Sequence, residues 1–253
     1  MVHAHPRVTR GACLTPFGHA RTLLGSALAC LALVACASDA DPGAFSPSEG
    51  AAAAEPGGPD LALPYATRVV SFEPGEGAGF GQASLPDVVL GPPAGKGTNA
   101  GSLDVLSLGK GGSIVLAFDG HSITDGEGPD LVVFENALWP GGDSSVVYAE
   151  PGEVSASDDG EHWQSFDCDA KGDGEGHFDG CAGVTPTLEY DAGSLVPLEP
   201  ALTGGDAFDL ADLGLKAASF VRVRDVSGAG DTPSAGFDLD AVGVVNVAAG
   251  DEP

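Results

Sequence analysis

Glycine and proline are so abundant in this chain that long helices are excluded from most of it. The 253 residues include 39 glycines and 19 prolines, and both residue types destabilise helix interiors. Between them lie short runs of β-branched and aromatic residues, which are typical of strands. We predict one short helical turn over residues 206–213. The predicted strands are 68–72, 87–90, 105–108, 113–118, 131–135, 153–157, 163–166, 219–226 and 239–247.

Two of these segments show the alternation of a strand that packs one face against a core. In residues 113–118 the large apolar side chains Ile114, Leu116 and Phe118 fall on one face, and in residues 219–226 valines alternate with Arg222 and Arg224. A period of two residues is the signature of such a strand. Many short strands separated by loop residues favour a sandwich or barrel, and about 180 residues make one domain. The pattern therefore predicts a single all-β domain.

The N-terminal residues have the pattern of an export signal. Arg7, Arg10 and Arg21 precede an apolar run over residues 22–34. This run has about 13 residues, whereas a helix needs roughly 20 to span a bilayer. Small residues before Cys36 resemble a bacterial lipobox, which implies cleavage before Cys36 and a diacylglycerol group on its sulfur. The alternative is an ordinary signal peptide with an incidental cysteine.

Composition divides the chain into four parts. We expect residues 1–35 to be the signal peptide, 36–64 a flexible tether, 65–249 the β-sandwich domain and 250–253 a tail. The tether is rich in Ala, Gly, Pro, Ser and Asp without a periodic apolar pattern, so it buries too little apolar surface to fold. Lipid at Cys36 would hold the domain in the cell envelope, at the outer membrane or cell surface.

The net charge is strongly negative. The chain has 10 Lys and Arg against 37 Asp and Glu, a formal charge of −27. Three of the cationic residues and none of the acidic ones precede Cys36, so the mature chain would carry −30. Such a charge repels phosphate backbones and argues against nucleic acid as a partner, while it attracts cations, Ca²⁺ above all. Acidity that only keeps a surface protein soluble is the alternative.

Two cysteines remain for the mature domain, and they lie 13 positions apart, Cys168 and Cys181, in a loop rich in Gly and Asp. Exported proteins meet an oxidising compartment, which favours a disulfide between them. Closing so short a loop stabilises the fold by about 3 kcal/mol on the chain-entropy model. Between the cysteines only His177 adds a zinc-type ligand, which is too few for a zinc site. We therefore predict the disulfide and interpret the acidic residues inside the loop as solvated.

One predicted strand and the turn after it follow the pattern V-x-x-S-x-D-G-x-x-W, with one position shifted, at Val154, Ser157, Asp159, Gly160 and Trp163. This pattern resembles that of coagulation-factor and discoidin-type C domains, which are galactose-binding-like jelly rolls. Residues 219–225 are similar to a later strand of the same domains. Discoidin domains usually tie their termini with a disulfide, whereas both cysteines here lie in one internal loop.

Three further stretches, 107–118, 125–136 and 236–242, are similar to uncharacterised bacterial cell-surface proteins. Together the resemblances cover about residues 69–247. They imply an antiparallel jelly-roll β-sandwich of the galactose-binding-like type and are uninformative about its ligand.

An acidic loop between two predicted strands has the composition of a calcium site. Its carboxylates are Asp119, Asp125, Glu127 and Asp130. Calcium takes six to eight oxygens from carboxylates, carbonyls and water, and glycines let a loop wrap around it. Asp238 and Asp240 share one face of a predicted strand and are expected to reach the same ion. The spacing is not that of an EF-hand, and turn residues that bind no ion are the alternative.

Two other residues are candidates for contact with a ligand. Trp139 lies in a loop followed by Pro-Gly-Gly, where an indole either stacks on a sugar ring or packs as a lid on the sandwich. Glu135 ends an apolar strand, so it is expected to be half-buried and to need a partner. That partner would be Arg222, Arg224 or a metal ion. Trp163, on a predicted strand, is expected in the core.

We therefore expect a lipid-anchored, non-catalytic cell-surface protein that binds a glycan or another envelope component, with structural calcium. There is no G-x-S-x-G elbow, and residues 91–98 miss the spacing of a phosphate loop. Two alternatives stay open. One is an extracellular hydrolase of polysaccharide, because carboxylates are abundant enough for a glycosidase pair. The other is a structural envelope or matrix protein.

Overall fold

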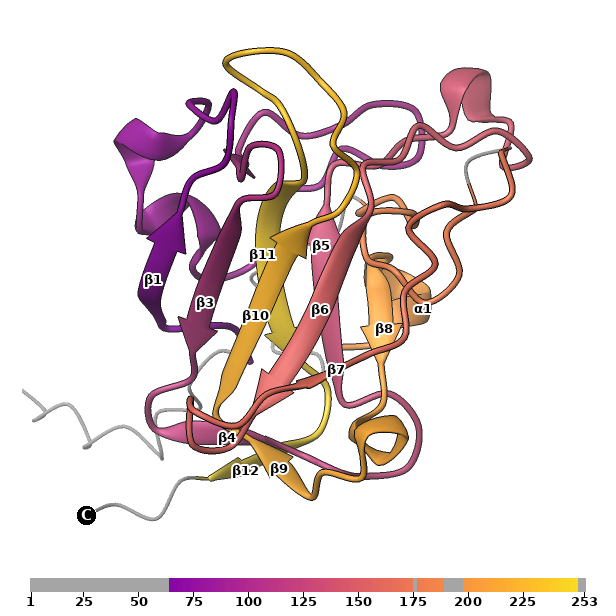
Figure 1. The fold of residues 1–253 in the computed structure, drawn as a ribbon. Coiled ribbons are helices and arrows are strands. Elements are labelled where there is room, and N and C mark those ends of the chain that lie inside the picture. The colour runs from indigo at the N-terminus through magenta and orange to yellow at the C-terminus, as the bar shows by residue number, and fades with distance from the viewer. Residues whose placement is uncertain (1–63, 175–176, 189–197, 250–253) are drawn as a thin grey trace, which may run out of the picture. The chain divides into compact units, whose positions relative to one another are not determined.

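The computed structural model describes residues 64–174, 177–188 and 198–249, which form an all-β sandwich of antiparallel strands (Figure 1). The predicted signal peptide, Cys36, the tether up to residue 63 and the tail lie outside the described residues. The chain divides into the units 1–55 and 56–253, and every described residue belongs to the second. Within the described part of the chain, no helix is long and apolar enough to cross a membrane.

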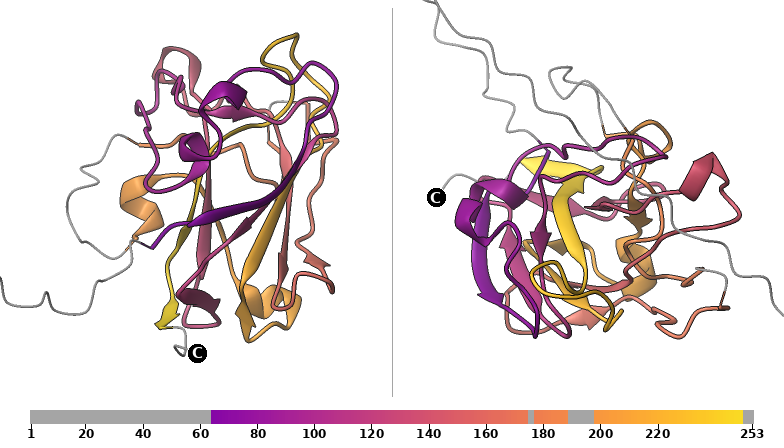
Figure 2. Two further views of the ribbon diagram at one scale, coloured as in Figure 1. Left: turned by 90° about the vertical axis from the view of Figure 1, so that its left-hand side faces the viewer. Right: turned by 90° about the horizontal axis from the view of Figure 1, so that it is seen from above.

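Two main sheets face each other, as the edge-on view in Figure 2 shows. The first has the strand order β1-β3-β10-β6-β7, with β1 Arg68–Glu73, β3 Ser113–Ala117, β10 Phe220–Asp225, β6 Gly152–Ser157 and β7 Gln164–Ser165. The second has the order β2-β11-β5-β8, with β2 Leu106–Ser107, β11 Asp238–Val244, β5 Leu131–Glu135 and β8 Asp206–Phe208.

A third, small sheet lies at one end of the sandwich, the lower end in Figure 1. Its order is β12-β4-β9, with β12 Val247–Ala249, β4 His121–Thr124 and β9 Ala217–Ala218. The described helices are all short: η1 Gln82–Ser84, η2 Asp87–Val89, η3 Pro140–Gly142, α1 Pro200–Thr203 and η4 Leu210–Leu213. The end of the sandwich opposite the small sheet, the upper end in Figure 1, consists mainly of loops.

The period-two prediction is confirmed, because alternate residues of β3 and β10 enter the core. Ile114 and Leu116 are fully buried, as are both valines of β10. Arg222 and Arg224 point away from the core, and Arg222 is half-buried. The apolar faces of the two main sheets thus meet in one cluster of Val, Leu, Ile and Phe side chains, and its burial is the main stabilising term of the fold.

Three predicted elements differ in the structure. Residues 87–90 form η2 instead of a strand, because a short apolar run fits either a strand or a buried turn, and Val89 enters the core from this turn. Residues 206–213 are only half helical: β8 pairs with β5, and η4 starts where the Asp209 side chain accepts the Ala211 N–H. Residues 239–247 are two strands, since β11 ends at Val244 and β12 starts at Val247.

Trp163 does not lie in the core as expected. It is half-buried beside β7, and the guanidinium of Arg222 lies 4.8 Å from the centre of its ring. This contact is a cation–π interaction on the outer face of the first sheet. It also engages one of the two arginines that were expected to pair with Glu135.

Candidate functional site

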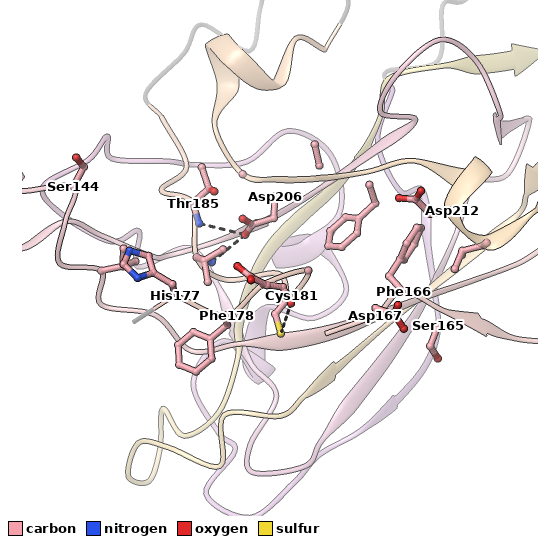
Figure 3. Close-up of a pocket in the computed structure, with 18 of the residues that line it drawn as sticks. Ser144, Ser165, Phe166, Asp167, His177, Phe178, Cys181, Thr185, Asp206 and Asp212 are labelled. Carbon is pink, nitrogen blue, oxygen red and sulfur yellow. Dashed lines mark hydrogen bonds between the residues drawn. The ribbon is translucent and has the colours of Figure 1, made fainter. Parts of the chain in front are cut away.

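A pocket of about 1020 Å³ opens beside β7 and β8, between the disulfide loop and the loop that follows Trp139. In the close-up of Figure 3, Ser144 and His177 lie toward one end of this side pocket, and Phe166 and Asp212 lie toward the other. Volumes of this size are typical of ligand sites. The side pocket is therefore the first candidate for a binding site.

Aromatic rings and carboxylates line the side pocket together. The aromatic residues are Trp139, Phe166, Phe178 and Phe208. The acidic residues are Asp167, Asp179, Asp206 and Asp212. Among the described residues that line it there is no Lys or Arg. The side pocket thus offers apolar faces and hydrogen-bond acceptors, and its charge disfavours anionic ligands.

The disulfide loop forms one wall of the side pocket. Cys168 and Cys181 are bonded, as predicted. Residues 177–181 and Asp167 line the pocket, so the loop is more than the solvated surface that its composition suggested. The loop returns to the sandwich where Ala182 and Gly152 exchange two backbone hydrogen bonds of 2.9 Å. The disulfide and this pairing therefore hold the wall against the first sheet.

Asp206, the first residue of β8, lies in the middle of the side pocket (Figure 3). Its Oδ2 accepts backbone N–H groups from Gly183 at 2.7 Å, Val184 at 3.0 Å and Thr185 at 3.4 Å. Burial raises the pKa of Asp206 to about 6, although these donors oppose the shift. The carboxylate therefore fixes the segment 183–185 in place.

Trp139 is half-buried and lines the side pocket. Its backbone N–H donates to the carbonyl of Thr98 at 2.7 Å, and Leu138 and Tyr148 form an antiparallel bridge next to it. The following residues turn into η3 at Pro140. The two roles considered for Trp139, sugar contact and lid, are both compatible with this position.

The predicted calcium ligands do not gather in one place. Asp119 is exposed and forms a bidentate ion pair with Arg68, at 2.8 and 3.0 Å, which lowers its pKa. Glu127 is exposed. Asp238 and Asp240 start β11, whereas Asp130 lies beyond its far end, where its carbonyl accepts the N–H of Val245. The expectation that all six carboxylates reach one ion is therefore wrong, because β11 separates two of them from the loop.

Two of the predicted ligands lie together with a third aspartate. Asp125, Asp130 and Asp209 place one carboxylate oxygen each within 4.8 Å of one another, and in the described part of the chain this is the one group that meets this spacing for a metal ion. Sequence reasoning missed Asp209, which lies 79 positions beyond Asp130 and approaches it only through the packing of η4.

Hydrogen bonds already account for this aspartate group. Asp130 is fully buried, and its oxygens accept from Gly126 N–H at 2.9 Å, Leu210 N–H at 2.8 Å and the Asn246 amide at 2.8 Å. Asp125 pairs with Lys216, and Asp209 accepts the N–H of Ala211. The group therefore joins three loops at the small sheet without needing an ion.

A second set of carboxylates lies at the loop-rich end of the sandwich. We call it the acidic end; it consists of Glu135, Glu150, Asp225 and Asp238. These residues come from the end of β5, the loop before β6, the end of β10 and the start of β11, in that order. All four are at least 94% buried. Four strand ends thus bring four acids, far apart in sequence, to one end of the fold.

Glu135 is 1% exposed, and neither of its carboxylate oxygens accepts a hydrogen bond of normal geometry, although the backbone N–H of Asn136 lies close enough to lower its pKa somewhat. Burial raises its pKa well above the usual value, and the charges of Asp238, Glu150 and Asp206 raise it further. Glu135 is therefore more deeply buried than expected, and neither predicted arginine reaches it. Arg222 donates to Ser155 at 3.3 Å, and Arg224 pairs with Glu153 at 3.1 Å.

The other acids near this end also have raised pKa values. Burial and the charges of Asp238 and Asp225 raise the pKa of Glu150 to about 7. Burial raises the pKa of Asp238 to about 6 and that of Asp240 to about 7. Asp240 accepts the backbone N–H of Ala94 at 2.9 Å. Nothing in the sequence singled out Glu150, which stands among many acidic loop residues.

Comparison with known protein families and with curated proteins finds no match to this chain. The side pocket can hold a ligand, the aspartate group has the spacing of a metal site, and the acidic end concentrates buried negative charge.

Proposed function

We propose that this protein is a lipid-anchored cell-surface protein that binds a glycan in the side pocket without catalysis. The observation that carries the proposal is the lining of that pocket, which combines aromatic rings with carboxylates and hydroxyl groups. Sugar rings present apolar C–H faces and hydroxyl edges. Aromatic side chains pack on such faces, and carboxylates accept hydrogen bonds from such edges.

The charge of the pocket selects among glycans. Its four aspartates, and the −27 charge of the chain, repel sulfated and uronate-rich polymers. Neutral sugars and amino sugars remain as ligands, and an ammonium group would gain from Asp167 and Asp179 on the disulfide loop. The proposal is thus specific to neutral or amino-sugar polysaccharides of the envelope or its surroundings.

The test is a glycan array probed with the full-length protein in detergent. We expect binding to neutral or amino-sugar oligosaccharides and none to heparin or polygalacturonate. Trp139→Ala should weaken this binding about tenfold or more, because a lost aromatic contact of roughly 1.4 kcal/mol changes affinity tenfold. Trp163→Ala is the matched control, since Trp163 lies beside Arg222 and does not line the pocket. Equal loss in both variants, or no glycan bound at all, would refute the proposal.

The lipid anchor is tested separately. Cys36→Ser is expected to leave the protein unlipidated and largely uncleaved, because the sulfur that would carry diacylglycerol is removed. Mass spectrometry of the N-terminus and partition into a detergent phase measure this. The prediction fails if the variant is cleaved at the same bond and partitions as the parent does.

The observations favour binding over the two alternatives. A glycosidase needs a pair of carboxylates on either side of the scissile bond, one of them with a raised pKa. Of the acids in the side pocket, Asp206 has a raised pKa, but its Oδ2 is engaged by backbone N–H groups. A purely structural protein has no need of an aromatic-lined pocket. Structural calcium is part of the proposal, and its candidate ligands are Asp125, Asp130 and Asp209.

A further inference from the structure

Beside the side pocket the chain crosses from the first main sheet to the second. Ala182 exchanges two backbone hydrogen bonds of 2.9 Å with Gly152, the first residue of β6. The carbonyl of Pro186 accepts the N–H of Gly205, just before β8, at 3.3 Å. Three residues, 183–185, lie between these two attachments. We call them the crossing segment, and they form part of the wall of the side pocket.

One side chain fixes the path of the crossing segment. Oδ2 of Asp206, which is 8% exposed, accepts the N–H groups of all three residues, at 2.7, 3.0 and 3.4 Å. Gly183 has a φ of +87°, and a Cβ there would lie 2.5 Å from the carbonyl oxygen of Glu150. Consecutive N–H groups that converge on one point form a nest that binds anions. The carboxylate of Asp206 is the anion in this nest.

The nest holds the ionised form of Asp206 more tightly than the protonated form. Hydrogen bonds from N–H groups to a carboxylate are roughly twice as strong as those between neutral groups. Burial raises the pKa of Asp206 to about 6, and the Thr185 hydroxyl and the N–H groups of the crossing segment oppose this shift. Donors that lower a pKa bind the carboxylate better than the acid. A proton on Asp206 therefore weakens its hold on the crossing segment.

We propose that Asp206 is the positioning residue of the side pocket, and that its ionised carboxylate holds Val184 and Thr185 where the ligand contacts them. This inference rests on the proposed glycan binding and names what regulates it. Ligand affinity falls on acidification, whereas the buried acids, whose pKa values are raised, make the fold more stable over the same pH range. A role of Asp206 in stability alone would not separate these two effects.

Other titratable groups share the surroundings of Asp206. The charge of Asp206 acts on Glu135, on the adjacent strand β5. The titratable groups that line the described pocket with it are Asp167, His177, Asp179 and Asp212. The N–H groups of the crossing segment donate to Asp206 instead of to any of these groups. Variants at the other positions therefore separate the charge of the pocket from the hold on its wall.

The first test follows the backbone amide resonances of the crossing segment in the ligand-free, full-length protein between pH 7.5 and pH 5. We expect the three amide proton signals to shift together with a midpoint near pH 6, because their common acceptor gains a proton. Asp206→Asn should abolish this titration. Asp212→Asn removes a charge from the same pocket and should keep it. Amide signals that do not titrate in the parent protein would overturn the proposal.

The second test measures affinity for the β-1,4-linked hexamers of glucose and of N-acetylglucosamine. Both probes are neutral at every pH used, so a change of affinity with pH reports a change in the protein. We expect the Kd to rise about tenfold between pH 7.5 and pH 5, where about a tenth of a group with a pKa of about 6 stays ionised. Asp206→Asn should bind with the same affinity at both pH values, and His177→Gln should keep the tenfold change.

The outcomes separate this inference from the proposed function. A tenfold change that persists in Asp206→Asn, or that His177→Gln removes, overturns the positioning role of Asp206. An affinity that rises on acidification together with the melting temperature overturns it as well. If neither hexamer binds while the amide signals of the crossing segment titrate, glycan binding is refuted, and the titration supports the hold of Asp206 on the wall of the pocket.

Discussion

Replacing Asp225 by alanine is expected to lower the free energy of unfolding by roughly 3–5 kcal/mol. Asp225 is 2% exposed at the end of β10. Its Oδ1 accepts from Phe237 N–H at 3.0 Å and Ser227 N–H at 3.2 Å. Its Oδ2 accepts from Gly111 N–H at 2.9 Å and Gly228 N–H at 3.2 Å. The Ser227 hydroxyl also donates to Oδ1. Alanine would leave these four backbone donors and the hydroxyl without this acceptor.

The substitution Asp225→Ala would destabilise two loops as well as the end of β10. Asp225 joins two loops, 109–112 and 227–237, at the acidic end, and the second of these leads into β11. We expect the melting temperature to fall by about 10 °C, since 1 kcal/mol corresponds to roughly 2–4 °C in a domain of this size. Asp231→Ala, in the same loop but exposed, is the matched control and should change stability by less than about 0.5 kcal/mol. Comparable losses in the two variants would contradict this assignment.

Strands with alternating or continuous apolar residues were predictable from the sequence. β3, β5 and β10 lie close to the predicted residues because apolar periodicity reports burial directly. β4, β9 and β12 were missed. They are two to four residues long and gain their stability from pairing with each other. A pattern read along the chain does not contain that information.

The break between β11 and β12 shows the same limit. Residues 239–247 form one apolar run in the sequence. The chain turns at Val245 and Asn246, because the backbone N–H groups of both residues donate to the carbonyl of Asp130, at 2.8 and 3.3 Å. That contact joins residues more than a hundred positions apart, so local propensity did not predict it.

The candidate sites were predictable only in part, for a similar reason. The disulfide was predictable because two cysteines remain in the mature domain of an exported protein. Trp139 was identified because it lies in a loop rich in Gly and Pro. Glu135 was recognised as a buried acid in need of a partner, and Asp238 as a candidate ligand, but Glu150, whose charge also acts on Glu135, was not recognised because it lies in a loop among many other acids. Asp209 was missed in the same way. Charge alone did not distinguish these residues from the many acids that are solvated.

The second large effect expected is an increase in stability on acidification of the calcium-free protein. Burial raises the pKa of Glu150 and Asp240 to about 7 and that of Asp206 and Asp238 to about 6. When unfolded, these groups titrate near 4. Between about pH 4 and pH 7 the folded state therefore binds more protons than the unfolded state, so the free energy of unfolding rises as the pH falls.

This direction is opposite to that of groups whose pKa is lowered on folding. The carboxyl of Asp119, beside Arg68, loses its contribution only when the pH falls below about 4. Maximum stability is therefore expected near pH 5. Each additional proton bound by the folded state raises the free energy of unfolding by about 1.4 kcal/mol for each pH unit of acidification. Two such protons therefore raise the melting temperature by roughly 5–10 °C between pH 7 and pH 6.

The measurement is the melting temperature in chelator from pH 8 to pH 4.5 at constant ionic strength. Asp240→Asn should flatten the rise, because the amide oxygen still accepts the Ala94 N–H but no longer titrates. Asp158→Asn removes the same charge from an exposed position, so it controls for relief of the overall negative charge and should leave the slope unchanged. A melting temperature that declines steadily from pH 8 to pH 5 would contradict this prediction, because it would show that burial does not raise the pKa of these acids. Equal flattening by both variants would assign the rise to net charge, because burial is the property in which the two positions differ.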